Sequence, residues 1–600
     1  MADQISHLPL QDLGLKNIPA VPYILDLKEP LSTVLRLGLR SLETQPAKKG
    51  LSNTYTIGGT NATGYEFLYG TAPTNPLMGA VGEIERLIIG GADAIIRSMS
   101  ATRTTASATR TTASNYTSRP LEQPEQFTIS WTNYWDVYKN AQPHLTTWAS
   151  SLISAADAAD QFWPTIASYG FAYNVIILKL VDATTAAALK PLFGETWTDE
   201  GIDAIQSAGR LYAIDMSIFE SFSPATVANL PRFTPGTITL LEQDAATKKL
   251  TPIAVKVASE NASVVYSATT SKPGAWLYAL QAAKASITVW GIWIGHVYHF
   301  HIVTASMQMT MYNNIPQTHP IYQLVEPRSN YLIGFNEVLL ALWSFIAPPT
   351  SFENPAKFLS LMDKYAAGRS YADDDPKNTI KAMGLDAAKF TQSQPWDLYP
   401  VVQDLLQIWD VTGHYVATFV DTTYTNDAAV AADAPLQAWM KAAADPNEGN
   451  VHGLPAMTNK QALKDMLTSL LYRVTAHGIA RLNNTANPAL TFGSNYPPCL
   501  QSTTLPPSDQ DLDTASLLKM LPWTETLGEL VNFYFTFVFS VPYESFIPLG
   551  GVETELPFPN GMKDARNRAL VVFRNRLIEF INDYEPDNPQ IYQWPLNIET

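Results

Sequence analysis

The stretch from Ala285 to Val325 reads ASITVWGIWIGHVYHFHIVTASMQMTMYNNIPQTHPIYQLV. It contains no Asp, Glu, Lys or Arg, yet it holds four of the chain's nine histidines. A surface helix needs a polar or charged face, which this stretch lacks. Ser, Thr, Gln, Asn and His interrupt it too often for a lipid-spanning helix of about 20 apolar residues. We therefore predict a buried central helix that brings imidazoles into an apolar interior, where a metal or reaction site can form.

The whole chain has the composition of a folded globular protein, with 600 residues of which 46% are hydrophobic and 11% aromatic. Its formal net charge of −16 argues against nucleic acid or an anionic membrane as a general partner, since both require a basic surface. The single cysteine, Cys499, excludes an internal disulfide. The N-terminal residues lack the basic start and apolar run of a secretory signal, so we expect a cytoplasmic protein without integral membrane association.

The residue pattern divides the chain into an irregular region and a helical region. The segment ATRTTAS occurs twice in succession, at 101–107 and 108–114, and such a Ser/Thr/Arg stretch without apolar anchors predicts a flexible insertion over about 98–118. We therefore expect an N-terminal irregular region over 1–120. The remainder, 121–600, is expected to form one helical domain.

A small β element is expected within this helical domain. The β-branched runs TPGTITLLEQ (234–243) and LTPIAVKV (250–257) flank the lysine-rich turn DAATKKL, which predicts a hairpin. Helical periodicity dominates from Trp276 onward. The predicted fold class is mostly α, arranged around the long buried central helix.

Several segments resemble the catalytic domain of lipoxygenases, without the N-terminal β-barrel of the plant and animal members. The match between His296 and Asn336 has no gap, which makes it specific. The matching segments are WTDEGIDAIQSAGRLYAID (197–215), LTPIAVKV (250–257), WLYALQAAK (276–284), HPIYQLVEP (319–327), TAHGIARLNN (475–484) and FRNRLIEFINDYEPDNPQIYQWPLNIET (573–600).

The resemblance implies a non-haem iron or manganese site. In the family, two histidines five positions apart on the central helix bind the metal, together with a third histidine on a later helix and an Asn or His four residues after it. The C-terminal carboxylate, usually of Ile, completes the set. Imidazole and oxygen ligands with an open position suit such metals, and the activity implied is the addition of O2 to a polyunsaturated lipid.

In the first alignment of this chain with the family pattern, which we call the first register, the set of metal ligands is incomplete. His296 takes the place of the second histidine and His477 that of the third, whereas Gly291 takes the place of the first. Arg481 stands at the Asn position, and arginine has no lone pair with which to bind a cation. The tail, IYQWPLNIET, is expected to stop about four residues before the family's terminal Ile.

A second register uses His296 and His301, which are also five residues apart, as the pair on the central helix. It gives His296, His301 and His477 as the metal ligands. His299 lies three residues after His296, so these two side chains are a further combination that could share one side of a helix.

Three functions follow from these alternatives, each with a hydrophobic small-molecule partner. The first is a diverged, metal-poor enzyme of specialised metabolism that acts on a polyene or terpenoid-type substrate, with His296 and His477 as general acid and base and Arg481 as a carboxylate or carbonyl anchor. The second is an active iron or manganese lipoxygenase that uses O2. The third is a non-catalytic lipid-binding protein.

Overall fold

The computed structural model describes residues 155–167, 176–227, 230–326, 355–386, 398–446, 448–486, 497, 499–520 and 558–582. The predicted irregular region 1–120, its flexible segment 98–118 and the boundary at residue 120 lie outside these residues. The C-terminal tail from residue 583 also lies outside them. These expectations remain predictions.

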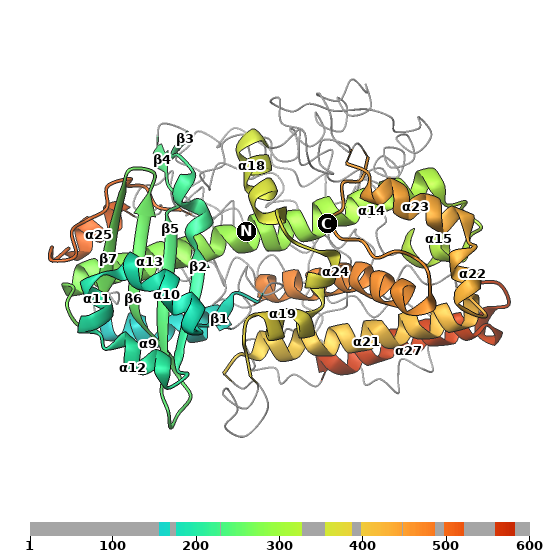
Figure 1. Cartoon of the computed structure of the whole chain (residues 1–600), viewed down its shortest axis with the longest axis horizontal. Helices are drawn as coiled ribbons and strands as arrows, with labels where there is room; N and C mark the ends of the chain where they lie inside the picture. The colour runs from blue at the N-terminus through green and yellow to red at the C-terminus, as the bar shows by residue number, and fades with distance from the viewer. Residues whose placement is uncertain are drawn as a thin grey trace, which may run out of the picture.

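An antiparallel five-stranded sheet occupies one end of the molecule (Figure 1). The predicted hairpin is confirmed, because residues 236–243 pair with 250–258 in antiparallel register. It forms part of a larger sheet than the sequence pattern indicated. In spatial order, the strands are β1 (Leu178–Leu180), β2 (Leu211–Met216), β5 (Gly236–Gln243), β6 (Leu250–Ser259) and β7 (Ala262–Ser267). A separate pair consists of β3 (Ala225–Val227) and β4 (Leu230–Arg232).

The turn between β5 and β6 is built by Asp244. Its Oδ1 accepts hydrogen bonds from the backbone N–H of Ala246 at 3.0 Å and of Thr247 at 2.7 Å. Lys248 adopts a left-handed φ of 61° to bring the chain back. An Asp side chain that bonds its own following backbone is a strong turn former, so this local chemistry fixes the hairpin's register.

Both faces of the sheet are covered by helices. On one face, Ile238 and Leu240 of β5 belong to an apolar cluster that includes Trp197. On the other face, Leu241 and Val255 join the main core with the central helix. The alternation follows from the two-residue period of a strand. The covering elements on the first face are α10 (Ala183–Phe193), α11 (Glu195–Asp199) and α12 (Ile202–Ser207); α9 (Ala155–Ala167) lies on the other, and η3 (Ser217–Ser221) follows β2.

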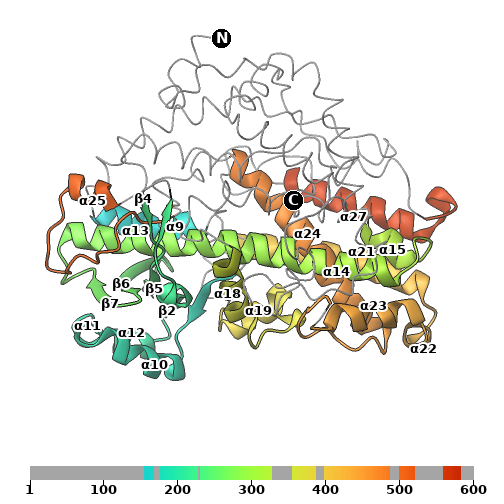
Figure 2. The same ribbon diagram turned by 90° about the horizontal axis from the view of Figure 1, so that it is seen from above.

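A single continuous helix runs from the sheet through the whole molecule, as predicted (Figure 2). It consists of α13 (Pro273–Trp290), the π-helix η4 (Gly291–Ile302) and α14 (Val303–Asn314). Nearly all its side chains are buried. No helix in the described part of the chain is both long and apolar enough to cross a membrane.

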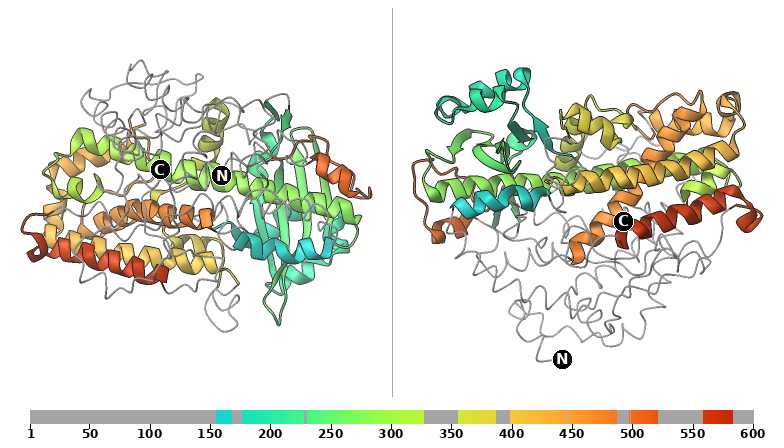
Figure 3. Two further views of the ribbon diagram at one scale, coloured as in Figure 1. Left: turned by 180° about the vertical axis from the view of Figure 1, so that it is seen from behind. Right: turned by 90° about the horizontal axis from the view of Figure 1, so that it is seen from below.

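Helices fill the other end of the molecule, which confirms the predicted mostly α fold class. The long helices α21 (Pro400–Thr423), α24 (Lys460–Ala486) and α27 (Ala565–Asn582) pack together, and α25 (Thr514–Met520) lies against α13 at the opposite end (Figure 3). The shorter elements are α15 (Pro320–Val325), α18 (Pro355–Ala366), η6 (Tyr371–Asp374), α19 (Pro376–Ala382), α22 (Asp427–Ala431), α23 (Ala434–Ala444) and η9 (Gly561–Lys563).

Two side chains fix the far end of the central helix. His319 caps α15, where its Nδ1 accepts from the N–H of Ile321 and its Nε2 lies 3.1 Å from Oδ2 of Asp433. Trp439 of α23 donates from Nε1 to the carbonyl of Met307 on α14 at 2.9 Å. These contacts hold α14 in place against α23.

Candidate functional site

The candidate site lies on the π-helical segment η4 of the central helix. In this segment each backbone hydrogen bond spans five residues instead of four. In an α-helix, a residue five positions later is rotated by about 140° around the axis. In a π-helix, the i→i+5 hydrogen bond brings that residue back above the first one. This change of winding places His296 and His301 on one side of the helix.

His296 and His301 converge with their ring nitrogens. Their Nε2 atoms lie 3.0 Å apart, and the ring centroids are separated by 4.7 Å at an interplanar angle of 65°. Both residues are buried, with exposed fractions of 8% and 1%. Two nitrogen ligands at about 2.1 Å from one metal, at a right angle to each other, would be about 3.0 Å apart. The spacing of the two Nε2 atoms therefore fits a shared metal ion.

The other positions that the sequence suggested as metal ligands contribute no described side chain. Gly291 is the first residue of η4 and offers no side chain. His477 and Arg481 both fall within α24, but their side chains lie outside the described part of the structure. The histidine pair that comes together is therefore the one in the second register, His296 with His301. Among the described side chains, no group of three His, Cys, Asp or Glu residues forms a metal cluster.

The helix that carries His477 packs against η4. One turn before His477, Arg473 of α24 donates from Nη1 to the carbonyl of His299 at 3.2 Å. Residues four apart share a helix face and differ in height by about 6 Å. The backbone of α24 thus passes the π-helix close to the position of His477.

His299 takes no part in the histidine pair, so the suggested combination of His296 with His299 is wrong. Its Nε2 lies 2.6 Å from the hydroxyl of Tyr365. Its Nδ1 lies 3.4 Å from Oδ1 of Asp374 and 3.3 Å from Nη1 of Arg473. Arg473 and Asp374 form a buried ion pair. Sequence reasoning missed this network, since its members come from four elements in three separate parts of the chain.

Burial decides the protonation of this network. It lowers the pKa of His299 well below the ordinary histidine value, and the positive charges of Arg473 and Arg369 lower it further. Burial also raises the pKa of Tyr365 above its ordinary value. Arg473 can only donate, so Nδ1 of the neutral imidazole accepts from its Nη1, and the proton on Nε2 is donated to the hydroxyl oxygen of Tyr365.

A cavity of about 320 Å³ lies between the sheet and the helical half. Its walls are mainly apolar and include Ile176, Met216, Trp290 and Phe300. Phe300 directly precedes His301, although the ring nitrogens of the pair are not part of the lining. A cavity of this size and character suits a hydrophobic ligand.

Comparison with known proteins gives a consistent result. The family model described as Lipoxygenase matches residues 225–522. The mouse (Mus musculus) polyunsaturated fatty acid lipoxygenase ALOX8 is 23% identical over 386 residues, which cover 62% of this chain and 54% of that protein. The manganese lipoxygenase of Pyricularia oryzae is 25% identical over 346 residues, or 54% of this chain and 52% of that protein. The chain thus spans about half the length of these curated relatives.

Solved structures share the fold. A fungal lipoxygenase from Fusarium graminearum superimposes with a TM-score of 0.61 at 16% identity, covering 75% of this chain and 73% of that one. A coral 8R-lipoxygenase gives a TM-score of 0.60 at 17% identity, covering 89% and 82%. The matching family model, the sequence relatives and the common fold agree. The chain therefore carries a catalytic domain of the lipoxygenase family and belongs to that family.

Proposed function

We propose that this chain is a non-haem iron or manganese oxygenase of the lipoxygenase type. The observation that supports this most is the 3.0 Å separation of the Nε2 atoms of His296 and His301. It replaces the glycine of the first register with an imidazole, and so removes one of the losses that favoured a metal-poor protein. The relatives named for polyunsaturated fatty acids and for manganese point to the same class of chemistry.

His296, His301 and His477 are the residues that we propose to hold the metal. The first two present their nitrogens from one helix, and the third lies on the helix that packs against it. When bound, the metal would supply the one-electron oxidant that removes a hydrogen atom from a carbon between two double bonds, before O2 adds.

The protein's own residues prepare this site in two ways. The π-helical winding fixes both imidazoles before any ligand arrives, which reduces the entropy lost on binding. The neighbouring buried side chains Ile292, Ile294 and Phe300 keep the surroundings apolar, so a hydrophobic chain is favoured over water. A polyunsaturated fatty acid or a similar polyene is the substrate class that we propose.

Arg481 supports the competing function of a metal-poor enzyme, since a guanidinium at a ligand position repels a cation. That function, and the non-catalytic lipid carrier, predict a purified protein without stoichiometric metal. Elemental analysis therefore separates the metal-binding oxygenase from the other two hypotheses, and a role in specialised metabolism would need the metal-poor outcome.

The decisive experiment is elemental analysis of the full chain expressed with iron and manganese, followed by oxygen uptake with linoleic acid. We expect about one metal per chain in the wild type. His301→Ala should reduce the metal content at least tenfold. His414→Ala, at an exposed histidine on α21, is the matched control and should leave it unchanged. A wild-type protein without iron or manganese contradicts the proposal.

A further inference from the structure

Large apolar side chains that reach solvent are rare in the described part of this chain, and they are concentrated in one segment. Of the three that are exposed there, Met562 and Val572 lie on η9 and α27, with exposed fractions of 49% and 56%. The third, Leu192, lies on α10 at the sheet end of the molecule. Figure 1 shows α27 along the outer edge of the helical half. Exposed apolar side chains that are grouped, unlike single ones, indicate a contact surface.

The same segment is basic. Residues 561–576 contain five Lys and Arg residues and a single acidic residue, Asp564, in a chain whose net charge is −16. Arg566 neutralises Asp564, because its Nε and Nη2 donate to the two carboxylate oxygens at 3.0 Å and 2.7 Å. Lys563, Arg568 and Arg576 are exposed. The segment therefore presents positive charge to solvent.

The apolar and basic side chains form one continuous surface. Arg568, Val572 and Arg576 are spaced by four residues, so they share one face of α27. Nη1 of Arg568 donates to the carbonyls of Met562 at 3.0 Å and Lys563 at 2.6 Å, which joins this face to η9. We call these five residues the η9–α27 surface.

The fold holds the η9–α27 surface in a fixed position. The buried side chain of Asn567 donates from Nδ2 to the carbonyls of Phe558 and Gly561, each at 2.8 Å. Phe573 stacks on Tyr415 of α21, with ring centroids 5.0 Å apart. The opposite face of α27 is therefore anchored in the core. A surface that is already ordered loses little entropy when it binds a partner.

The neighbouring helix does not cancel the positive charge. On α21, the carboxylates whose side chains the structure describes are those of Asp410 and Asp421. Asp410 pairs with Lys377 at 2.6 Å, and Asp421 pairs with Lys460 at 2.6 Å and Lys464 at 2.9 Å. Exposed charges separated by more than about 8 Å are largely screened at physiological ionic strength. A partner at this surface therefore interacts with the local positive charge more than with the net charge of the chain.

We infer that the η9–α27 surface docks the protein on a membrane that carries anionic lipids. The basic side chains suit negatively charged lipid headgroups, and Met562 and Val572 suit the apolar layer just below the headgroups. A nucleic acid would attract the basic residues through its phosphates, but it gains nothing from the two exposed apolar side chains. The negative net charge of the chain disfavours contact through the rest of the surface.

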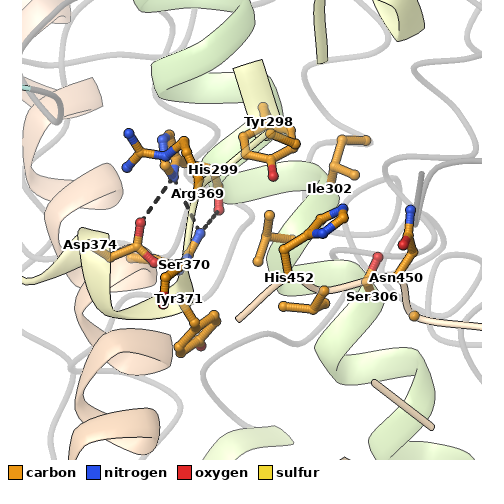
Figure 4. A pocket seen from close by; sticks show the side chains of 15 residues that line it. Tyr298, His299, Ile302, Ser306, Arg369, Ser370, Tyr371, Asp374, Asn450 and His452 are labelled. Atoms are coloured by element: carbon orange, nitrogen blue, oxygen red, sulfur yellow. Dashed lines mark hydrogen bonds and ion pairs between the residues drawn. The ribbon is translucent and has the colours of Figure 1, made fainter. Parts of the chain in front are cut away.

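The η9–α27 surface is separate from the metal site proposed on η4. The side chains around the small cavity at the central helix come from other elements, including His299 of η4 and Ser306 of α14 (Figure 4). The inference therefore does not depend on whether the chain binds a metal.

Co-sedimentation of the full-length protein with lipid vesicles tests this inference. One preparation contains phosphatidylcholine alone, and the other contains phosphatidylcholine mixed with phosphatidylserine. We expect binding to the mixed vesicles only, and we expect it to weaken as sodium chloride is added. Lys563→Gln removes one basic side chain and should weaken binding about fivefold. Val572→Glu places a charge where the apolar layer lies and should weaken binding about tenfold or more.

Two variants on α10 are the matched controls. Lys190→Gln and Leu192→Glu make the same kinds of change at an exposed lysine and at an apolar residue that is 42% exposed. Both should bind like the wild type. The inference is overturned if the mixed vesicles bind no more protein than the neutral ones, if the α10 variants weaken binding as much as the η9–α27 variants, or if the protein binds single-stranded RNA more tightly than the vesicles. Circular dichroism establishes that each variant is folded.

Discussion

His296 and His301 are five residues apart in the chain, yet their Nε2 atoms lie 3.0 Å from each other. An α-helix would turn the two side chains about 140° apart. The π-helical winding of η4 is therefore the structural feature that creates the pair. It also directs His299, between them, toward a different set of partners on α18, η6 and α24.

The first prediction concerns stabilisation by metal. A ligand that binds only the folded state raises the free energy of unfolding by about 2.7 kcal/mol at 100 times its dissociation constant. Adding Mn²⁺ or Fe²⁺ to metal-depleted protein should therefore raise the unfolding temperature. The shift should disappear in His296→Ala and persist in His414→Ala, as measured by differential scanning calorimetry. Equal shifts in both variants would exclude His296 as a ligand.

The second prediction concerns pH. The pKa of His299 is well below its ordinary value in the folded protein, mainly because of burial. As pH falls below about 6.5, the unfolded chain takes up a proton that the folded chain does not. The stability of the wild type should thus decrease relative to His299→Gln by up to about 1.4 kcal/mol per pH unit between pH 6.5 and 5. Urea unfolding at several pH values measures this difference.

The control for this pH experiment is His414→Gln, at an exposed position. Its stability should follow that of the wild type over the same range. A constant difference between the wild type and His299→Gln from pH 7 to 5 would mean that His299 titrates alike in the folded and unfolded states.

The third prediction concerns the buried pair of Asp374 and Arg473, whose side chains are 7% and 6% exposed. Asp374→Ala leaves an uncompensated buried cation and should destabilise the protein by about 3–5 kcal/mol. The double variant Asp374→Ala with Arg473→Met removes both charges and should be less destabilised than the sum of the single variants. Denaturant unfolding checks this, and additive effects would show that the two groups do not interact.

The fourth prediction compares two glycines on helices. A Cβ at Gly274 of α13 would overlap the backbone of Leu512, whereas a Cβ at Gly413 of α21 would lie 3.7 Å from Cγ2 of Thr468, an ordinary contact. Gly274→Ala should therefore destabilise by about 1–3 kcal/mol. Gly413→Ala should stabilise by up to about 1 kcal/mol through helix propensity. Thermal unfolding of the two variants should give shifts of opposite sign.

Much of the fold follows from local patterns along the chain. The uncharged stretch around His296 predicts the buried central helix, and the runs around Asp244 predict the β5–β6 hairpin; the structure confirms both. The pairing of β1 and β2 with this hairpin was not predicted, because strands joined through α10–α12 carry no local signal of their partner. The roles of His477 and Arg481 stay predictions, since their side chains lie outside the described residues.

The sequence by itself determined that histidines enter an apolar interior, because uncharged residues leave no other place for that helix. Only the tertiary structure decided which histidines meet. Two side chains that are five residues apart point in different directions on an α-helix and in similar directions on a π-helix. The spacing alone does not reveal which of the two helices forms. The network of His299 with Asp374, Arg473 and Tyr365 is likewise tertiary, because long-range packing brings together groups from three separate parts of the chain.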